Sequence, residues 1–176
     1  LYGVNTLRAS ENFQISERKL AKYPDLISAI AKVKWAAANA NEELGSLPKD
    51  KAAAIRAACK DLIAGRHHSA FIIDPIQGGA GTSTNMNANE VIANLALRHM
   101  GRKPGDYGAL NPNNDVNMSQ STNDVYPTAL RVATILSSYR LMDALAQLAD
   151  AFAAKGLEFN RILKVGRTQL QDAVPM

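Results

Sequence analysis

The sequence contains one cysteine, Cys59, so no disulfide can form within the chain. Cys59 lies in an alanine-rich helical pattern, which favours a buried, unreactive thiol over a catalytic nucleophile. The sequence also lacks any apolar stretch long enough to cross a membrane, and its first residues show no signal-peptide pattern. These absences predict a cytoplasmic protein with no membrane partner.

Charge of one sign is not concentrated anywhere along the chain. The net charge is +4, from 20 Lys and Arg against 16 Asp and Glu, and the two signs are interspersed. This pattern is typical of a solvated surface and predicts no nucleic-acid partner. Aromatic residues make up only 6% of the sequence, whereas alanine recurs in runs such as 36–38 and 52–54. Since alanine loses no side-chain entropy on ordering, this bias favours helix.

Apolar residues at helical spacing predict helices over residues 24–44, 50–62 and 82–100, and over more than thirty residues from about Asn123. In the first of these helices the apolar stripe comprises Leu26, Ile30, Val33, Ala37 and Ala40. Residues 1–22 are expected to form a loop with a short helical turn, and residues 71–73 an isolated strand or an extended segment. The connection 102–119, rich in Gly, Pro and Asn, is long enough to indicate a functional loop.

The last predicted helix is unusually long and carries few charges. At 1.5 Å per residue it would extend roughly 45–50 Å, and a helix this apolar needs cover on more than one side. We therefore expect an all-α fold, with an N-terminal helical domain at residues 1–122 and the start of a long-helix bundle at residues 123–176. Further residues or other subunits would complete the bundle. The chain opens without an initiator Met and closes after a polar segment, so we expect an N-terminal fragment of a longer protein.

Three polar segments place small hydroxyl and amide side chains where a helix begins or the chain turns. In the first, residues 78–90, glycines would let the backbone approach a ligand, and the following helix would offer free N–H groups to an anion. A glycine turn with a Thr or Ser N-cap also explains the spacing. The segment lacks the Gly-Lys-Ser/Thr of a Walker A loop and the third glycine of a dinucleotide fingerprint. Asn85 and Asn89 share a helix face and need partners if they are buried.

The second segment, residues 111–124, leads into the long helix. Ser121 or Thr122 would cap that helix, with Pro127 in its first turn, where a missing N–H is harmless. Capping needs only one hydroxyl, however. Ser121, Thr122 and Asn123 in a row supply two hydroxyl donors, an amide and a helix dipole, a combination suited to a carboxylate. The third segment, residues 166–175, is by itself equally compatible with a polar turn between helices.

Together the three segments resemble the first motif blocks of the aspartase/fumarase superfamily. The blocks are Gly-Gly-Ala-Gly-Thr-Ser-x-Asn-Met-Asn-x-Asn-Glu at 78–90, Gln-Ser-Thr-Asn-Asp at 120–124 and Gly-Arg-Thr-Gln-Leu-Gln-Asp-Ala-Val-Pro-Met at 166–176. They occur in the family's order and at plausible spacing. The opening segment 2–9 is also similar to the aspartase branch. The match covers essentially the whole chain, and three blocks in order are highly specific.

Four positions side with the aspartase branch over the fumarases. Fumarases carry His where this chain has Gln169 and Asn111, usually read Ser-Ser-Asn at 121–123, and differ around 78–80. Some aspartases also carry His at the Gln169 position. The resemblance therefore implies a lyase that reversibly deaminates L-aspartate to fumarate and ammonia. The alternative is fumarate hydratase, which interconverts fumarate and L-malate. A non-catalytic helical scaffold would predict loss of the site donors, which are present.

The resemblance also implies a mechanism. A base removes a proton next to the β-carboxylate of the substrate, which becomes a doubly charged aci-carboxylate before the amine leaves. Uncharged donors suit this dianion, each being worth on the order of 3 kcal/mol in comparable oxyanion sites. By carry-over, the β-carboxylate would be bound by Thr82, Ser121 and Thr122, the amino group would lie near Asn123 and Gln169, and the α-carboxylate would be bound by Thr168. The family's serine base lies beyond Met176, so no catalytic residue is expected in this chain.

Family active sites combine segments from three subunits of a homotetramer, so a site shared between subunits is expected here too. The partner is a small molecule, L-aspartate or fumarate, and the chemistry requires no cofactor. His67, His68 and His99 lack metal-ligand spacing and are interpreted as surface or structural residues, so no metal site is expected. Activation by a divalent metal is an open alternative.

Overall fold

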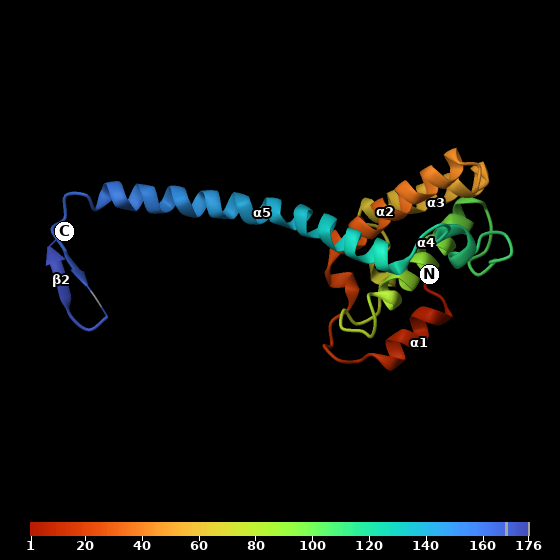
Figure 1. Cartoon of the computed structure of the whole chain (residues 1–176), viewed down its shortest axis with the longest axis horizontal. Coiled ribbons are helices and arrows are strands. Elements are labelled where there is room, and N and C mark those ends of the chain that lie inside the picture. The colour runs from red at the N-terminus through yellow and green to blue at the C-terminus, as the bar shows by residue number, and fades with distance from the viewer. Residues whose placement is uncertain (168, 176) are drawn as a thin grey trace. The chain divides into compact units, whose positions relative to one another are not determined.

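The computed structural model describes residues 1–167 and 169–175, and helices dominate it (Figure 1). Contacts group the chain into two units, Leu1–Leu136 and Ser137–Met176. The elements of the first unit are α1 (Val4–Asn12), α2 (Pro24–Glu43), α3 (Lys49–Ile63), α4 (Thr82–His99), short helical turns at Leu20–Lys22, His68–Ala70 and Pro112–Val116, and the first turns of α5 (Thr122–Glu158). The second unit holds the rest of α5 and the strands β1 (Val165–Arg167) and β2 (Asp172–Pro175).

Three helices of the first unit end in the same glycine-dependent motif. After α2, Gly45 adopts a left-handed φ of +73°, and the N–H of Ser46 donates to the carbonyl of Asn41 at 2.9 Å. Gly65 and Gly101 end α3 and α4 in the same way. The left-handed residue turns the chain back so that later N–H groups satisfy the last carbonyls of the helix. The helical hairpin of α2 and α3 is therefore encoded locally.

The core of the first unit is built around α4. Every residue of this helix from Asn87 to Leu97 is buried, and α1, α2 and α3 all pack against it. The buried side chains Ala88, Val91, Ile92 and Leu95 meet the alanine-rich faces of α2 and α3, while Ala129 and Ala133 bring the start of α5 into the same core. Small residues allow helices to approach closely, which explains how a domain poor in aromatics fills its interior.

The buried face of α2 differs from the apolar stripe that the sequence predicted. Its buried residues include Ile27, Ile30, Lys34, Ala38 and Asn41. Of the predicted stripe only Ile30 is buried, whereas Leu26, Val33 and Ala37 are half-buried and Ala40 is exposed. The prediction was off by one position because Lys34 and Asn41 are polar, so counting apolar residues favoured the neighbouring face.

The N-terminal residues form a nine-residue helix, α1, where a loop with a single turn was expected. Its start is fixed by Glu90 of α4, a side chain only 2% exposed. The Glu90 carboxylate accepts hydrogen bonds from the N–H groups of Gly3 (2.8 Å), Asn5 (3.0 Å) and Thr6 (3.1 Å) and from the Thr6 hydroxyl (2.6 Å). A carboxylate at a helix N-terminus satisfies the free N–H groups and complements the helix dipole. This contact spans more than eighty residues, so local sequence could not reveal it.

Two segments that were expected to be irregular have defined structures. Residues 71–73 form an extended segment, in which the carbonyls of Phe71 and Ile73 accept from the N–H groups of Ala21 and Leu20. The long connection 102–119 contains a π-helical turn at Pro112–Val116, capped by the Asn111 side chain.

The second unit consists of the remainder of α5 and a β-hairpin. The whole of α5 has 37 residues, which corresponds to about 55 Å and agrees with the long helix predicted from about Asn123. Beyond Leu136 its large apolar side chains are exposed, namely Tyr139, Leu141, Met142, Leu145, Leu148, Phe152 and Leu157. Strands β1 and β2 pair antiparallel, with Val165 opposite Pro175, so the third polar segment is a hairpin within an otherwise helical chain.

The expected division into domains at residues 122 and 123 concerns the complete protein and stays a prediction. In this chain the first turns of α5 pack with the first unit through Ala129 and Ala133. Among the described residues, no helix combines the length and hydropathy that crossing a membrane requires.

The anchoring of α1 can be tested with Glu90→Gln. The amide would face the N–H groups of Gly3, Asn5 and Thr6 with one acceptor fewer and without charge, so we expect the free energy of unfolding to fall by about 2–3 kcal/mol. Urea denaturation measures this loss. Glu11→Gln, at an exposed position of α1, is the matched control and should stay within about 0.5 kcal/mol. Equal effects of the two substitutions would contradict the anchoring role.

Candidate active site

The N-termini of α4 and α5 meet in the first unit, which brings the first two polar segments together. Gly81 precedes α4 with a left-handed φ of +82°, and the ring of Tyr126 on α5 lies so close that a Cβ at Gly81 would overlap it. One turn further along α4, the Asn85 Nδ2 donates to the Thr122 Oγ1 at 3.0 Å. Glycine is needed here for both the backbone conformation and the ring contact.

At the start of α4, Thr82 is exposed and its side chain does not cap the helix. A Thr or Ser N-cap was one reading of this segment, and it is wrong because Gly81 occupies the cap position. The Thr84 N–H is satisfied by Gln77 Oε1 at 2.9 Å. Within the described part of the chain, no protein acceptor meets the N–H groups of Thr82 or Ser83. The α4 terminus therefore presents an exposed hydroxyl and two unsatisfied donors.

At the start of α5, the cap is Ser121, one of the two residues that the sequence offered for this position. Its Oγ accepts from the Asn123 N–H at 3.2 Å, and its carbonyl accepts from Val125 N–H at 3.0 Å. Pro127, expected in the first turn, is instead the sixth helical residue, because α5 begins at Thr122. Its missing N–H leaves the Asn123 carbonyl without the usual helical donor.

The Thr122 hydroxyl is oriented by its neighbour. Thr122 is half-buried, while Ser121 and Asn123 on either side are exposed. Because the Thr122 Oγ1 accepts the hydrogen bond from Asn85, its own hydroxyl proton points in another direction. This hydroxyl can therefore still donate one hydrogen bond.

A half-buried residue, Asn117, hydrogen-bonds to α4 and to the loop before α5 through its side-chain amide. Its Oδ1 accepts from Asn85 Nδ2 at 3.0 Å and from Asn89 Nδ2 at 3.2 Å, and its own Nδ2 donates to the carbonyl of Gln120 at 3.0 Å. Asn85 and Asn89, which share a face of α4 and are both buried, therefore have a hydrogen-bond acceptor for their side-chain amino groups. Their own Oδ1 atoms are buried without a protein partner among the described residues.

The third donor to Asn117 is a lysine. Lys34 of α2 is completely buried, and its Nζ lies 2.8 Å from Asn117 Oδ1. Burial lowers the pKa of the Lys34 ammonium to about 7, because desolvation disfavours the charged form. Burial also raises the pKa of the nearby Cys59 thiol to about 12, so this thiol stays protonated at neutral pH. The prediction of a buried Cys59 is confirmed.

The loop between the π-helical turn and α5 is held in an unfavourable conformation. Ser119 adopts a left-handed φ of +58°, which costs a non-glycine residue about 1–3 kcal/mol. The carbonyl of Met118 beside it accepts from Asn41 Nδ2 of α2 and from Gln120 Nε2, both at 3.0 Å. Strain of this kind persists only where surrounding contacts enforce it, and here it lies two residues before Ser121.

The structure thus brings together four of the six predicted site residues, Thr82, Ser121, Thr122 and Asn123, at the two helix starts. Gln169 is exposed in the second unit, between β1 and β2. Thr168 lies outside the described residues. No group of three metal-ligating side chains occurs among the residues that the structure describes. His99 pairs with Asp61, and the ring of His68 contacts the Leu62 carbonyl.

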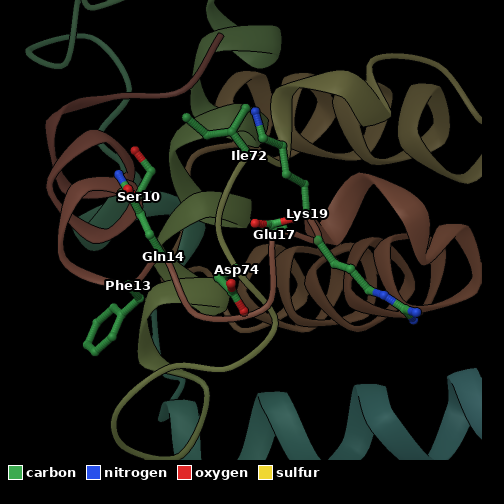
Figure 2. A pocket seen from close by; sticks show the side chains of 8 residues that line it. Ser10, Phe13, Gln14, Glu17, Lys19, Ile72 and Asp74 are labelled. Atoms are coloured by element: carbon green, nitrogen blue, oxygen red, sulfur yellow. The ribbon is translucent and has the colours of Figure 1, made fainter.

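A separate pocket lies beside the C-terminal half of α1 (Figure 2). It is lined by Ser10, Phe13 and Gln14, by the loop residues 17–19, and by Ile72 and Asp74. The Asp74 carboxylate is occupied by the N–H groups of Ile15, Ser16 and Ile76, so it organises the surrounding loops. None of the predicted site residues lines this pocket.

Sequence reasoning missed Lys34, Asn41 and Asn117 as parts of the site. Asn117 stood within the second polar segment but was given no role of its own. Lys34 and Asn41 lie seven residues apart, two helical turns, and both fall on the face that continues Ile27 and Ile30. A lysine on an otherwise apolar helix face would have indicated a buried polar contact. Recognising this signal, however, required knowing which face of α2 is buried.

Comparison with known proteins supports one family. The model of the lyase family matches residues 1–176, and the chain belongs to this family. It is 61% identical over 99% of its length to an aspartate ammonia-lyase from Pseudomonas aeruginosa, of which it spans 37%. Other curated aspartate ammonia-lyases, including one from Escherichia coli, are 53–59% identical over similar spans.

Solved structures agree with this assignment. The crystal structure of fumarate lyase:delta crystallin from Brucella melitensis matches with a TM-score of 0.96 and 59% identity, over 99% of this chain and 41% of that one. A class II fumarase from Schistosoma mansoni matches with a TM-score of 0.87 but only 33% identity, over 99% of this chain and 37% of that one. The expected all-α family fold is confirmed, and the chain spans well under half the length of the proteins it matches.

A pair of glycine substitutions tests how tightly the two helix starts are joined. Gly81 and Gly101 both have left-handed φ values, but a Cβ at Gly101 would meet nothing within 4 Å. Gly101→Ala should therefore cost only the backbone term, about 1–2 kcal/mol. Gly81→Ala must also displace the Tyr126 ring, so we expect it to lower the free energy of unfolding by about 1–3 kcal/mol more. Denaturation of the two variants measures the difference, and equal losses would argue against the Gly81–Tyr126 contact.

Proposed function

We propose that this chain is part of an aspartate ammonia-lyase, which reversibly removes ammonia from L-aspartate to give fumarate. The observation that most directly supports this proposal is the 61% identity to an aspartate ammonia-lyase over 99% of the chain. The meeting of the α4 and α5 N-termini supplies an independent physical argument. Both termini present hydroxyls and N–H groups. The first residue of each helix is an uncharged threonine, Thr82 in α4 and Thr122 in α5, so it does not repel an anion.

The chemical problem in this reaction is the doubly charged carboxylate that forms when a proton leaves the neighbouring carbon. Donors that are already oriented stabilise such charge most in the transition state, because they need not reorganise as it develops. We propose that Thr82, Ser121 and Thr122 bind this carboxylate, aided by the α4 and α5 dipoles. The hydrogen bond from Asn85 to the Thr122 Oγ1 supports this role, because it leaves the Thr122 hydroxyl proton free to donate.

The remaining substrate contacts are assigned by resemblance. Asn123 and Gln169 would lie near the amino group, and Thr168 would bind the α-carboxylate. The base would come from a segment of the complete protein outside this chain. The chemistry would need no cofactor, since the developing charge is met by hydrogen bonds and helix dipoles.

The exposed apolar side chains of α5 beyond Leu136 support assembly with other helices. Leu141, Leu145, Leu148 and Phe152 recur at helical spacing and are each at least half exposed. A soluble helix does not leave such a stripe uncovered. We propose that the complete protein is a cytoplasmic homotetramer in which this helix enters a shared bundle and each active site combines segments from several subunits.

Fumarate hydratase is the less favoured assignment, because the class II fumarase from Schistosoma mansoni shares 33% identity with this chain whereas the curated aspartate ammonia-lyases share 53–61%. The complete protein should therefore form fumarate from L-aspartate, followed by absorbance at 240 nm. Activity on L-malate with none on L-aspartate would replace the proposal by the hydratase.

Thr122→Ala in the complete protein tests the proposed carboxylate site. Losing one oriented donor to the dianion should lower kcat on L-aspartate more than tenfold, in line with about 2.7–4 kcal/mol for single oxyanion donors. The matched control is Thr134→Ala, also on α5, whose hydroxyl donates to the Leu130 carbonyl of its own helix. The control should keep kcat within about twofold of the unmodified enzyme, since it touches no proposed site residue. An unchanged rate in Thr122→Ala would remove Thr122 from the carboxylate site.

A further inference from the structure

The one lysine buried completely in the described part of the chain lies under the proposed carboxylate site. Lys34 is 0% exposed, and the ion pairs of the described residues do not include it. Its Nζ donates to Asn117 Oδ1 at 2.8 Å. Burying an amine that could become charged is costly unless specific partners compensate, so a lysine at this position requires an explanation.

A short series of hydrogen bonds leads from Lys34 to Thr122. Asn117 Oδ1 accepts from both Lys34 and Asn85, and Asn85 Nδ2 also donates to Thr122 Oγ1. The other side of the Asn117 amide donates to the carbonyl of Gln120, the residue immediately before Ser121. One amide therefore joins α2, α4 and the loop that leads into α5. Its orientation decides where the Asn85 donor points.

We propose that Lys34 is a positioning residue for catalysis, which fixes the Asn117 amide so that Asn85 holds the Thr122 hydroxyl proton toward the substrate carboxylate. This inference rests on the proposed function, since it concerns how that site is organised. Without the Lys34 donor, the Asn117 amide keeps its bonds to Asn85, Asn89 and Gln120 but loses its shortest one, so its orientation is held less firmly. Thr122 would then populate rotamers in which its proton no longer faces the ligand.

A purely structural role makes a different prediction. If Lys34 only held the fold together, replacing it would lower stability and activity in parallel. The side chain lies among Ile27, Ile30 and Ala38 on the buried face of α2, so Met fits its volume without leaving an unpaired amine. Replacing buried charged groups by apolar groups of similar volume is often neutral or stabilising. A positioning role for Lys34 therefore predicts that replacing it by Met lowers the activity but leaves the stability unchanged or raises it.

Lys34→Met in the complete protein tests this prediction. We expect kcat on L-aspartate to fall at least tenfold, KM to change less than threefold, and the melting temperature to stay equal or rise. Asn117→Ala should lower kcat comparably, and the double variant should be no slower than Asn117→Ala alone, because both substitutions break one series of bonds. Lys51→Met is the matched control: this lysine of α3 pairs with Asp115 and is outside the series, so kcat should stay within twofold.

The outcomes separate the inference from the proposed function. An unmodified enzyme inactive on L-aspartate would refute the proposed function. An active enzyme whose Lys34→Met variant keeps kcat within twofold, or whose two substitutions act additively, would overturn the role of Lys34. Should Lys34→Met fail to fold, Asn85→Ala breaks the same series one bond from Thr122. Asn87→Ala is its control, since the Asn87 amide donates to the Ala70 carbonyl instead. A kcat within twofold in folded Asn85→Ala would then overturn the inference.

Discussion

The hydrogen bonds that converge on the Asn117 oxygen are the constraint on which the site depends. Donors from α2 and α4 meet there, and the same amide holds the loop that starts α5. Because buried amides are costly to leave unpaired, this cluster tolerates few arrangements. It therefore sets the position of α5 relative to α4 within the first unit, and with it the position of Thr122 beside the α4 terminus. The strained Ser119 lies in the same loop, between Asn117 and α5.

Uncharged donors match the proposed chemistry better than cations would. A lysine or arginine in direct contact would bind the substrate carboxylate strongly before the reaction as well as during it. Oriented hydroxyls and helix N-termini gain most when the second negative charge develops. In this arrangement the Lys34 amine is buried, it donates to Asn117, and burial lowers its pKa to about 7. In this account Lys34 affects the substrate indirectly, through the side-chain amides of Asn117 and Asn85.

Local sequence patterns predicted much of this fold because several of its helices and their ends are determined by neighbouring residues. The helices from Pro24, Thr82 and Thr122 follow from apolar spacing, and Gly45 and Gly101 end the first two of them. Helix α1 was not predicted, since its start depends on Glu90, more than eighty residues away. The buried face of α2 was misplaced by one residue because Lys34 is polar. At the site, the residue types at 82 and 121–123 indicated an anion, whereas Lys34 and Asn117 entered only through tertiary contacts.

The central claim is that the α4 and α5 termini bind the carboxylate that becomes doubly charged. It is tested most directly by a crystal structure of the complete protein with a bound four-carbon dicarboxylate such as succinate. We predict one carboxylate within about 3.2 Å of the Thr122 hydroxyl and of at least one donor from Thr82 or Ser121. A dicarboxylate bound elsewhere, with the Thr122 hydroxyl facing no ligand oxygen, would contradict the account.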